Sequence, residues 1–396
     1  MVALDITITE DQPSETRKDD ASDENAKRGL LEFSAASCCK DRLQPVATYP
    51  SLRSSSQDRT DSPVEWSKQH IVALSQTHLR YLVLSAELAG STGATKAVTM
   101  HEFTLGATDG YPLAAELWTS NDSTPPSVAA LVNAGAGIGS PYYRRFATFL
   151  AGANIPTVLY DYRGIGRSRP HSLRGFAASV EEWGSKDCAA ALTWLEARFP
   201  AAKRLVIGHS VGGFVTGFVT NGRLIDLMLL IGAHTGYWRD YATRARPAMY
   251  LLWHTIMPAL THLFGYFPGR RLHLLEDLPA GIALEWANRR QPDFWWNLKT
   301  QAGEVDRLRV NEVIARFLDI RAPTLALRFV DDVFATEAAT TRVLALYKNC
   351  WPTQIVLGPQ DVGGQKIGHF GFFRSRFRET LWPRVTDWIR VGETAE

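Results

Sequence analysis

The residues with the clearest chemical potential lie at Gly208-His209-Ser210-Val211-Gly212, a G-x-S-x-G pattern. The apolar run 205–207 before it predicts a buried strand, and the small, apolar segment after Ser210 predicts a helix. In this arrangement the serine occupies a sharp strand-to-helix turn in a strained conformation. Larger side chains at positions 208 and 212 would collide there, so both positions need a very small residue. The pattern therefore predicts a nucleophilic Ser210, with the Val211 N–H directed to the place where negative charge develops on an attacked carbonyl.

A serine hydroxyl becomes a nucleophile at neutral pH only beside a base, and the base needs a carboxylate to fix its tautomer. After such a turn the expected chain order is serine, acid, histidine. Asp331 and Asp332 directly follow a predicted strand at 323–329, and we predict that Asp332 is the acid, with Asp331 as the alternative. His369 lies between a predicted strand at 353–357 and the terminal helix, where the base is expected.

Neighbouring residues complete the predicted site. The loop after a predicted strand at 128–132 is small enough to approach a ligand closely, and either Gly135 or Ala136 would supply a second N–H for the oxyanion. We expect His209 to be a packing residue of the turn. His234, just past a predicted strand at 225–231, could help to shape a substrate pocket.

Strands alternate with helices through most of the chain, which predicts an α/β fold with a mostly parallel sheet and right-handed crossovers. An antiparallel hairpin from Val98 to Leu117 is expected to precede it. The aromatic-rich segment 233–319 interrupts the alternation and predicts a helical cap, between two core segments at 97–232 and 320–392. Residues 1–95 are rich in Ser, Asp, Lys and Arg and predict a largely disordered extension, with a possible helix at 64–89.

Composition excludes several classes of function. The net charge of the 396-residue chain is only +2, so its overall charge favours neither a nucleic-acid partner nor an acidic membrane surface. The 4 cysteines form no C-x-x-C spacing or Cys/His cluster, so we predict no disulfide framework, no metal site and no cofactor, in a reducing compartment. The N-terminus lacks a basic region and a long apolar run, so no secretory signal is expected, and the prediction is a cytoplasmic protein.

The most apolar long stretch is Pro247–Pro268, which is interrupted by His254, Pro258 and His262. We expect it to form a buried or cleft-lining helix pair and not a membrane span. The expected partner of the protein is a small-molecule substrate, and the sequence makes no prediction of oligomeric state.

Several motifs together resemble the serine aminopeptidase S33-like family of α/β hydrolases. They are the elbow, Asp161-Tyr162-Arg163-Gly164-Ile165-Gly166-Arg167-Ser168, Gly265-Tyr266-Phe267-Pro268-Gly269-Arg270, Asp277-Leu278-Pro279-Ala280-Gly281 and Gly368-His369-Phe370-Gly371. The resemblance covers about residues 97–390. It implies the α/β-hydrolase fold with a helical cap and a triad of Ser210, Asp332 and His369, but no particular substrate.

We therefore expect a serine hydrolase that attacks an ester or amide carbonyl of a hydrophobic small molecule through an acyl-enzyme. One alternative is a protein of the same fold that binds ligands without catalysis. Another is a dinucleotide-binding oxidoreductase, because Gly135-Ala136-Gly137-Ile138-Gly139-Ser140 follows a strand and Asp161 ends the next strand. Against that alternative, the third glycine position holds Ser140, and the elbow stays unexplained.

Overall fold

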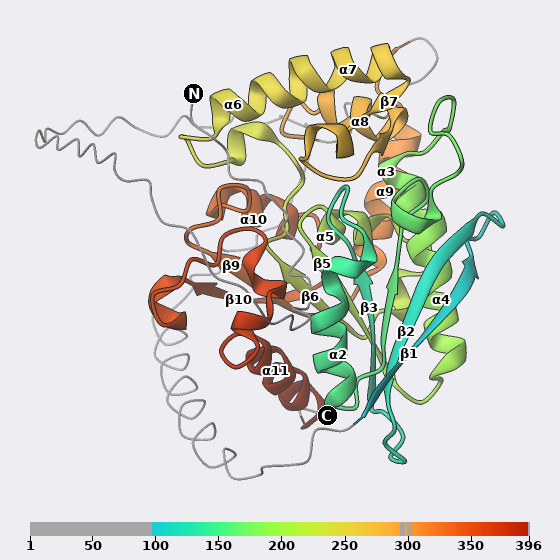
Figure 1. The fold of residues 1–396 in the computed structure, drawn as a ribbon, viewed down its shortest axis with the longest axis vertical. Helices are drawn as coiled ribbons and strands as arrows, with labels where there is room; N and C mark the ends of the chain where they lie inside the picture. Colours follow the sequence, from blue (N-terminus) through green and yellow to red (C-terminus); the bar gives the residue numbers. More distant parts are fainter. Residues whose placement is uncertain (1–96, 294–297, 299–302, 395–396) are drawn as a thin grey trace, which may run out of the picture. The chain divides into compact units, whose positions relative to one another are not determined.

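The computed structural model describes residues 97–293, 298 and 303–394 (Figure 1). The N-terminal segment 1–95 and the possible helix at 64–89 therefore lie outside the described residues.

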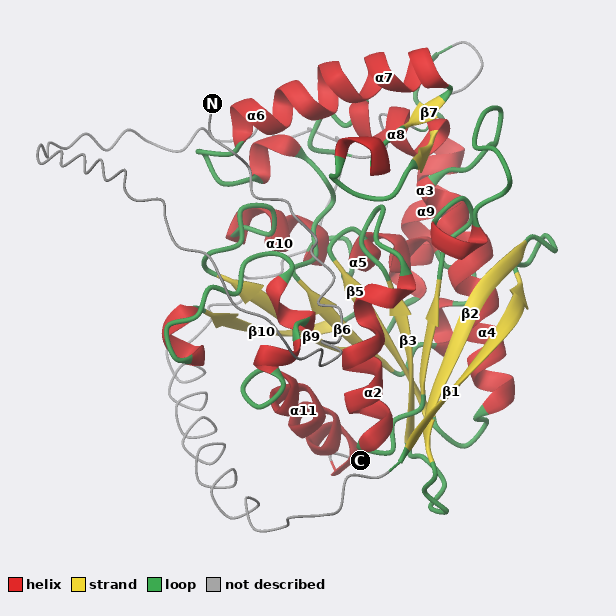
Figure 2. Cartoon of the chain, viewed as in Figure 1, coloured by secondary structure: helices red, strands yellow, loops and turns green. Residues whose placement is uncertain are grey.

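An eight-stranded sheet forms the centre, with the strand order β1-β2-β4-β3-β5-β6-β9-β10 (Figure 2). Strand β2 is antiparallel to β1 and β4, and the remaining neighbours are parallel, so the prediction of a mostly parallel sheet after an N-terminal hairpin is confirmed. The strands are β1 Val98–Gly106, β2 Pro112–Ser120, β3 Val128–Asn133, β4 Thr157–Tyr160, β5 Lys203–His209, β6 Leu227–Ile231, β9 Pro323–Phe329 and β10 Trp351–Leu357.

Helices cover both faces of the sheet: α2 and α11 pack on one face and α4 on the other (Figure 1). The core helices are α2 Arg144–Gly152, α3 Val180–Glu182, α4 Ala189–Arg198, α5 Gly212–Val215, α9 Arg307–Asp319, α10 Glu337–Leu344 and α11 Trp382–Thr394. A π-helical segment, Trp183–Cys188, joins α3 to α4 within the helix expected at 180–198. The helix expected at 211–220 is shorter, because α5 passes into a single 3₁₀ turn, Thr216–Phe218.

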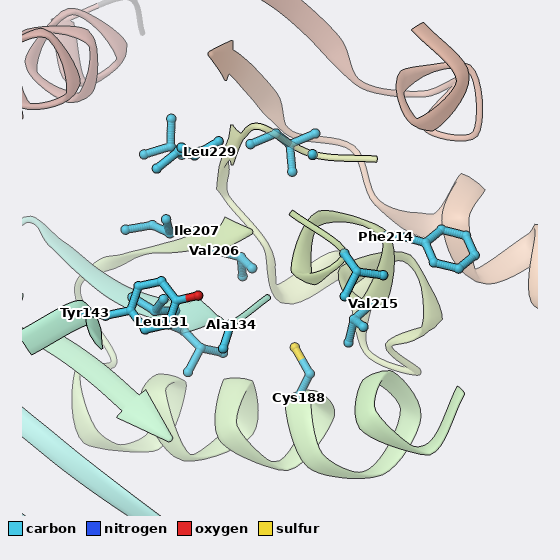
Figure 3. Packing of buried hydrophobic residues seen from close by; sticks show 14 of the residues in the cluster. Leu131, Ala134, Tyr143, Cys188, Val206, Ile207, Phe214, Val215 and Leu229 are labelled. Carbon is cyan, nitrogen blue, oxygen red and sulfur yellow. The ribbon is translucent and has the colours of Figure 1, made fainter. Parts of the chain in front are cut away.

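The strands β3, β5 and β6 at the centre of the sheet are largely buried. Every residue of β3 and β6 is buried, as expected for strands of a parallel sheet covered on both faces. Figure 3 shows Leu131, Val206, Ile207 and Leu229 from neighbouring strands, with side chains of α5 and of the flanking helical segments around them. This packing holds the carboxyl ends of β3, β5 and β6 in place, and those ends carry the site.

In the segment expected to form the cap, the described residues before α9 include the α-helices α6 Arg246–Leu251, α7 Met257–Phe264 and α8 Ala280–Ala287. They also include a two-stranded sheet of β7 Tyr266–Phe267 and β8 Leu278–Pro279. A π-helical segment, Leu252–Ile256, joins α6 to α7 into one helical run. Pro258 has no N–H to donate to the carbonyl of His254, which accepts instead from Arg290 at 3.3 Å. Helix α9 packs against the 3₁₀ turn behind the elbow, so it lies against the core.

Candidate active site

The turn after β5 has the backbone of a nucleophile elbow. Ser210 has a φ of +56°, a left-handed conformation that is rare for residues other than glycine. A Cβ at Gly208 would lie 2.5 Å from the Cα of Gly213, and one at Gly212 would lie 2.1 Å from the carbonyl oxygen of Asn133. Both outer positions of the pattern therefore require glycine in this turn.

Ser210, His369 and Asp332 come together at the end of the sheet. Ser210 Oγ lies 2.8 Å from His369 Nε2, and His369 Nδ1 lies 2.7 Å from Asp332 Oδ2. Because a carboxylate accepts, Nδ1 carries the ring proton and donates it to Asp332, which leaves Nε2 to accept from the serine hydroxyl. All three side chains are buried, at 7%, 6% and 4% exposure, so the hydrogen bonds are shielded from competing water.

The two adjacent aspartates have different partners. Asp332 Oδ1 accepts from the N–H groups of Phe334 at 2.8 Å and Ala335 at 3.0 Å, which leaves Oδ2 directed at His369. Burial alone would raise the pKa of Asp332, but the charge and hydrogen bond of His369 and these two N–H groups lower it below its ordinary value. Asp331 instead accepts from the N–H of Ile367 at 2.8 Å, so the structure favours Asp332 over its neighbour.

A second histidine contacts the serine hydroxyl. His234 Nε2 lies 3.1 Å from Ser210 Oγ, and its Nδ1 accepts from the N–H of Gly236 at 3.0 Å. Burial, together with the neighbouring His369, holds the pKa of His234 well below its ordinary value, so the ring is neutral. Since Nδ1 accepts, the single ring proton is on Nε2 and is donated to Ser210. Sequence reasoning placed His234 near the pocket but did not foresee this contact.

His209 does more than fill the turn. Its Nδ1 lies 2.8 Å from Tyr143 Oη, and its Nε2 lies 3.1 Å from the carbonyl oxygen of His369. The same Tyr143 hydroxyl accepts from the N–H of Gly135 at 2.9 Å. One chain of hydrogen bonds thus joins the loop after β3, the elbow and the histidine loop, and these contacts add to the packing role expected of His209.

This chain also separates the two candidates for the second oxyanion donor. The N–H of Gly135 is directed at Tyr143 and away from the nucleophile, which argues against the first candidate. Ala136 lines the same cavity as Ser210, and its N–H makes no hydrogen bond with the rest of the described chain. Of the two candidates, Ala136 is therefore the one whose N–H has no hydrogen bond with the described residues.

Gly232, which the sequence analysis did not single out, leaves room for the side chains of Asp332 and His369. Gly232, directly after β6, has a φ of +55°, and a Cβ there would lie 3.2 Å from Asp332 Oδ2 and 3.5 Å from His369 Nδ1. The signal was present in the sequence, because a glycine that ends a buried strand marks a turn with close approach of the backbone.

The cavity above Ser210 is strongly apolar. It encloses about 710 Å³ of space, part of it open to solvent. Its floor carries Ser210, His234 and His369. Apart from these three, the described lining residues are Ala136, Ile138, Tyr241, Leu252, Trp253, Met257, Leu274, Leu275, Leu278, Trp286, Phe334 and Phe370. No carboxylate lines this part of the cavity, and within the described residues no cluster of three or more His, Cys, Asp or Glu could hold a metal ion.

A parallel sheet entered by an antiparallel hairpin, with a strained serine elbow after a central strand, defines a serine hydrolase of the α/β-hydrolase fold. Comparison with family models agrees with this class. The model described as "Serine aminopeptidase, S33" matches residues 124–362, which is more than half of the chain. The chain belongs to this family, so the predicted resemblance is confirmed.

Solved structures give similar folds at low identity. An esterase from Pyrococcus furiosus is 15% identical with a TM-score of 0.48, over 75% of this chain and 92% of that one. A hypothetical protein from Pseudomonas aeruginosa is 13% identical with a TM-score of 0.48, over 76% of this chain and 97% of that one. An esterase from Exiguobacterium antarcticum is 13% identical with a TM-score of 0.44, over 73% of this chain and 100% of that one. At these values the neighbours carry no argument about substrate. No curated protein matches the chain.

The family match overturns the dinucleotide-binding alternative, and the contacts of Asp161 give the physical reason. Its carboxylate is 1% exposed and accepts from the N–H groups of Ser140 at 2.6 Å and Arg167 at 2.9 Å. It therefore braces two loops and is buried too deeply to contact a ribose. No described helix is long and apolar enough to cross a membrane.

Proposed function

We propose that the protein is a carboxylesterase-like serine hydrolase that cleaves esters of hydrophobic small molecules. The observation that carries this proposal is the hydrogen-bonded series Asp332–His369–Ser210 on the floor of an apolar cavity. His369 donates its Nδ1–H to Asp332 and accepts at Nε2 from Ser210, which is the arrangement that a general base needs to activate the serine.

In the proposed reaction, Ser210 Oγ attacks the ester carbonyl and its proton passes to His369 Nε2. The N–H groups of Val211 and Ala136 donate to the oxyanion. His369 then returns the proton to the departing alkoxide as the carbon–oxygen bond breaks, which leaves an acyl-enzyme. Water attacks this ester with His369 again as the base, and the carboxylic acid is released with Ser210 restored.

Asp332 holds the His369 ring in the tautomer that this sequence needs and stabilises the imidazolium that forms. We assign His234 a positioning role. By donating Nε2–H to Ser210 Oγ, it occupies a lone pair of the oxygen and turns the hydroxyl proton toward His369. A neutral donor does this without adding a positive charge beside the imidazolium.

The cavity lining favours esters over the substrates of an aminopeptidase. A peptide with a free N-terminus carries a positive amine, which is costly to bury without a counter-charge. The described lining offers no carboxylate to that amine, whereas its leucines and tryptophans suit an aliphatic or aryl group.

We also propose a cytoplasmic location for the protein. The buried free thiols of Cys188 and Cys350 support it, because reduced cysteines are usual in the cytoplasm.

A panel of p-nitrophenyl esters of graded chain length, measured beside aminoacyl anilides, tests this proposal. We expect turnover of the esters, weak or no turnover of the anilides, and loss of ester turnover in Ser210→Ala. Ser172→Ala removes an exposed serine away from the cavity and serves as the matched control. Anilide turnover above that of every ester, or full activity in Ser210→Ala, would contradict the proposal.

A further inference from the structure

The helical run α6–α7 has an apolar face that the described protein leaves uncovered. Tyr250, Leu251, Ile256 and Leu263 are 39%, 52%, 38% and 69% exposed. The other exposed positions of this run are Pro247, Ala248, Thr255, Ala259 and His262, so after Arg246 no formally charged residue interrupts the face. We call these nine positions the outer cap face.

The opposite side of the same run is apolar for a different reason. Leu252, Trp253 and Met257 line the cavity above Ser210. A helix that is apolar on all sides is expected to be buried on all sides, because a surface helix normally presents charged residues to water. The expectation of a cleft-lining helix pair at Pro247–Pro268 therefore holds for the inner side, and the outer side has no partner among the described residues.

Arginines outnumber acidic residues in the segments that flank this face. The stretch from Arg239 to Asp277 contains five arginines and three acids, Asp240, Glu276 and Asp277. Glu276 is paired with Arg270 and Asp277 with Arg169. Asp240 is 5% exposed and is paired with Arg342, so it contributes little negative potential at the surface. The net charge of +2 for the whole chain hides this local excess of cations.

Contacts place two of these arginines beside the apolar residues. The Arg239 guanidinium lies over the ring of Trp238 at 5.2 Å, and Trp238 packs edge-on against Tyr250 at 4.7 Å between centroids. At the other end of the run, the Arg271 guanidinium lies 5.8 Å from the ring of Phe264. Arg239, Arg244 and Arg271 are exposed, and none of them forms an ion pair with the described residues. The cations thus flank the outer cap face at both ends.

We propose that the outer cap face docks on the surface of a lipid bilayer that contains anionic lipids. The helical run would lie in the plane of the interface, with Leu251, Ile256 and Leu263 among the acyl chains and the arginines at the phosphate level. This inference concerns a surface and does not depend on the catalytic residues. If the proposed esterase activity also holds, the face would bring the mouth of an apolar cavity close to where hydrophobic esters partition.

A second copy of the chain fits this face less well. A two-fold contact would place the same patch on both partners. The flanking arginines of one copy would then approach those of the other. In the stretch 239–277 the one acid that is not buried is Glu276, and it is already paired with Arg270. Anionic headgroups supply the charge that a second copy lacks.

Co-sedimentation of the full-length protein with vesicles tests the proposal. The vesicles are phosphatidylcholine alone or phosphatidylcholine with about 30% phosphatidylglycerol. We expect binding to the anionic vesicles that weakens with added salt, and weaker binding to the neutral ones. The double variant Leu251→Glu/Leu263→Glu should lower the vesicle affinity at least about tenfold, because it places charge within the apolar interface. Arg244→Ala and Arg271→Ala should each lower it about fivefold.

Matched controls separate docking from general damage. Leu308→Glu changes a leucine of α9 that is 83% exposed but lies off the outer cap face, and it should bind vesicles like the wild type. Ser210→Ala should also bind normally, so a failure of the esterase proposal leaves this test intact. The double variant should hydrolyse a water-soluble short-chain ester at the wild-type rate.

Three results would overturn the proposal. The first is a wild type that does not sediment with anionic vesicles, and the second is a double variant Leu251→Glu/Leu263→Glu that sediments as well as the wild type. The third is a wild-type dimer in analytical ultracentrifugation that the double variant converts to a monomer, because the face would then serve a second copy of the chain.

Discussion

The floor and the roof of the cavity are built on different principles. The floor consists of loops at the carboxyl ends of β3, β5, β6, β9 and β10. Its polar atoms are held by specific partners at 2.7–3.1 Å, as in the contacts of His369 and His234. The roof consists mainly of cap side chains such as Leu252, Trp253 and Met257, which contribute shape and little polarity.

The difference assigns the two tasks of the molecule to two regions. Transfer of a proton between Ser210 and His369 needs atoms fixed within tenths of an ångström, and strand ends in a packed sheet supply that. Selection of an apolar substrate needs volume, which a cap can change without disturbing the reacting groups. Variants of the floor should therefore change the rate of the reaction, and variants of the roof should change the choice of substrate.

The largest expected effect is the loss of kcat when the nucleophile or the base of the floor is removed. Ser210→Ala and His369→Ala should each lower kcat for a p-nitrophenyl ester by about a millionfold, and the double variant should lose no more than either single variant. The reason is that nucleophile and base act as one unit. Steady-state kinetics of all three variants check this, and additive losses would show that the two residues act independently.

The next effect separates the neighbouring aspartates. Asp332→Asn should lower kcat about ten-thousandfold, because an amide favours the wrong tautomer of His369. Asp331→Asn serves as the control and should retain most of the activity, since Asp331 contacts Ile367 and not the histidine. The reverse order of the two losses would transfer the acid role to Asp331.

Substitution of His234, also in the floor, should lower kcat less than substitution of Asp332. His234→Phe removes the donor to Ser210 Oγ and should lower kcat about ten- to a hundredfold with little change in KM. His234→Gln retains an N–H and should recover part of that loss. Equal kcat in the two variants, or a change confined to KM, would mean that the ring merely shapes the cavity.

One substitution in the roof tests its separate task. Leu252→Trp should lower kcat/KM for p-nitrophenyl decanoate about tenfold and leave p-nitrophenyl acetate unchanged, because the larger ring fills the apolar space. Leu251→Trp, the adjacent residue on the exposed side, is the matched control. If kcat/KM falls equally for both esters, the roof does not select substrates independently of the floor.

The smallest effect concerns how pH affects the stability of the floor. Burial, with the neighbouring His369, lowers the pKa of His209 from 6.5 to about 3. Between these values the unfolded chain binds a proton at this position and the folded chain does not, so stability falls as the pH falls. From about pH 7 to about pH 5 this residue should remove about 2 kcal/mol of stability.

Urea unfolding at several pH values measures this contribution. In His209→Gln the slope of the unfolding free energy against pH should decrease by about one proton in that range. The slope is the readout because the substitution also changes the stability itself. An unchanged slope would show that His209 titrates normally in the folded protein.

Much of the floor could be predicted from the sequence because its signals are local. A G-x-S-x-G between a buried strand and a helix specifies one strained turn, and the acid and base follow in loops after later strands. The predicted bounds of the strands at Thr157–Tyr160 and Pro323–Phe329 were confirmed, since apolar runs buried on both faces end abruptly at polar loops. The fold class followed from the alternation of these elements.

The remaining features depend on contacts between distant segments. That His209 would contact the carbonyl oxygen of His369, or that His234 would reach Ser210, follows from the packing of separate loops and not from any local pattern. The roof was the least predictable region. Its helices carry apolar residues on two sides, and sequence periodicity does not tell which side covers the cavity.

The most direct test of the central claim is labelling with a fluorophosphonate followed by peptide mass analysis. We expect one covalent adduct, on the peptide that contains Ser210, which forms quickly in the wild type and in Ser172→Ala. It should form orders of magnitude more slowly in His369→Ala. A wild-type protein that stays unlabelled, or an adduct on another residue, would contradict the account.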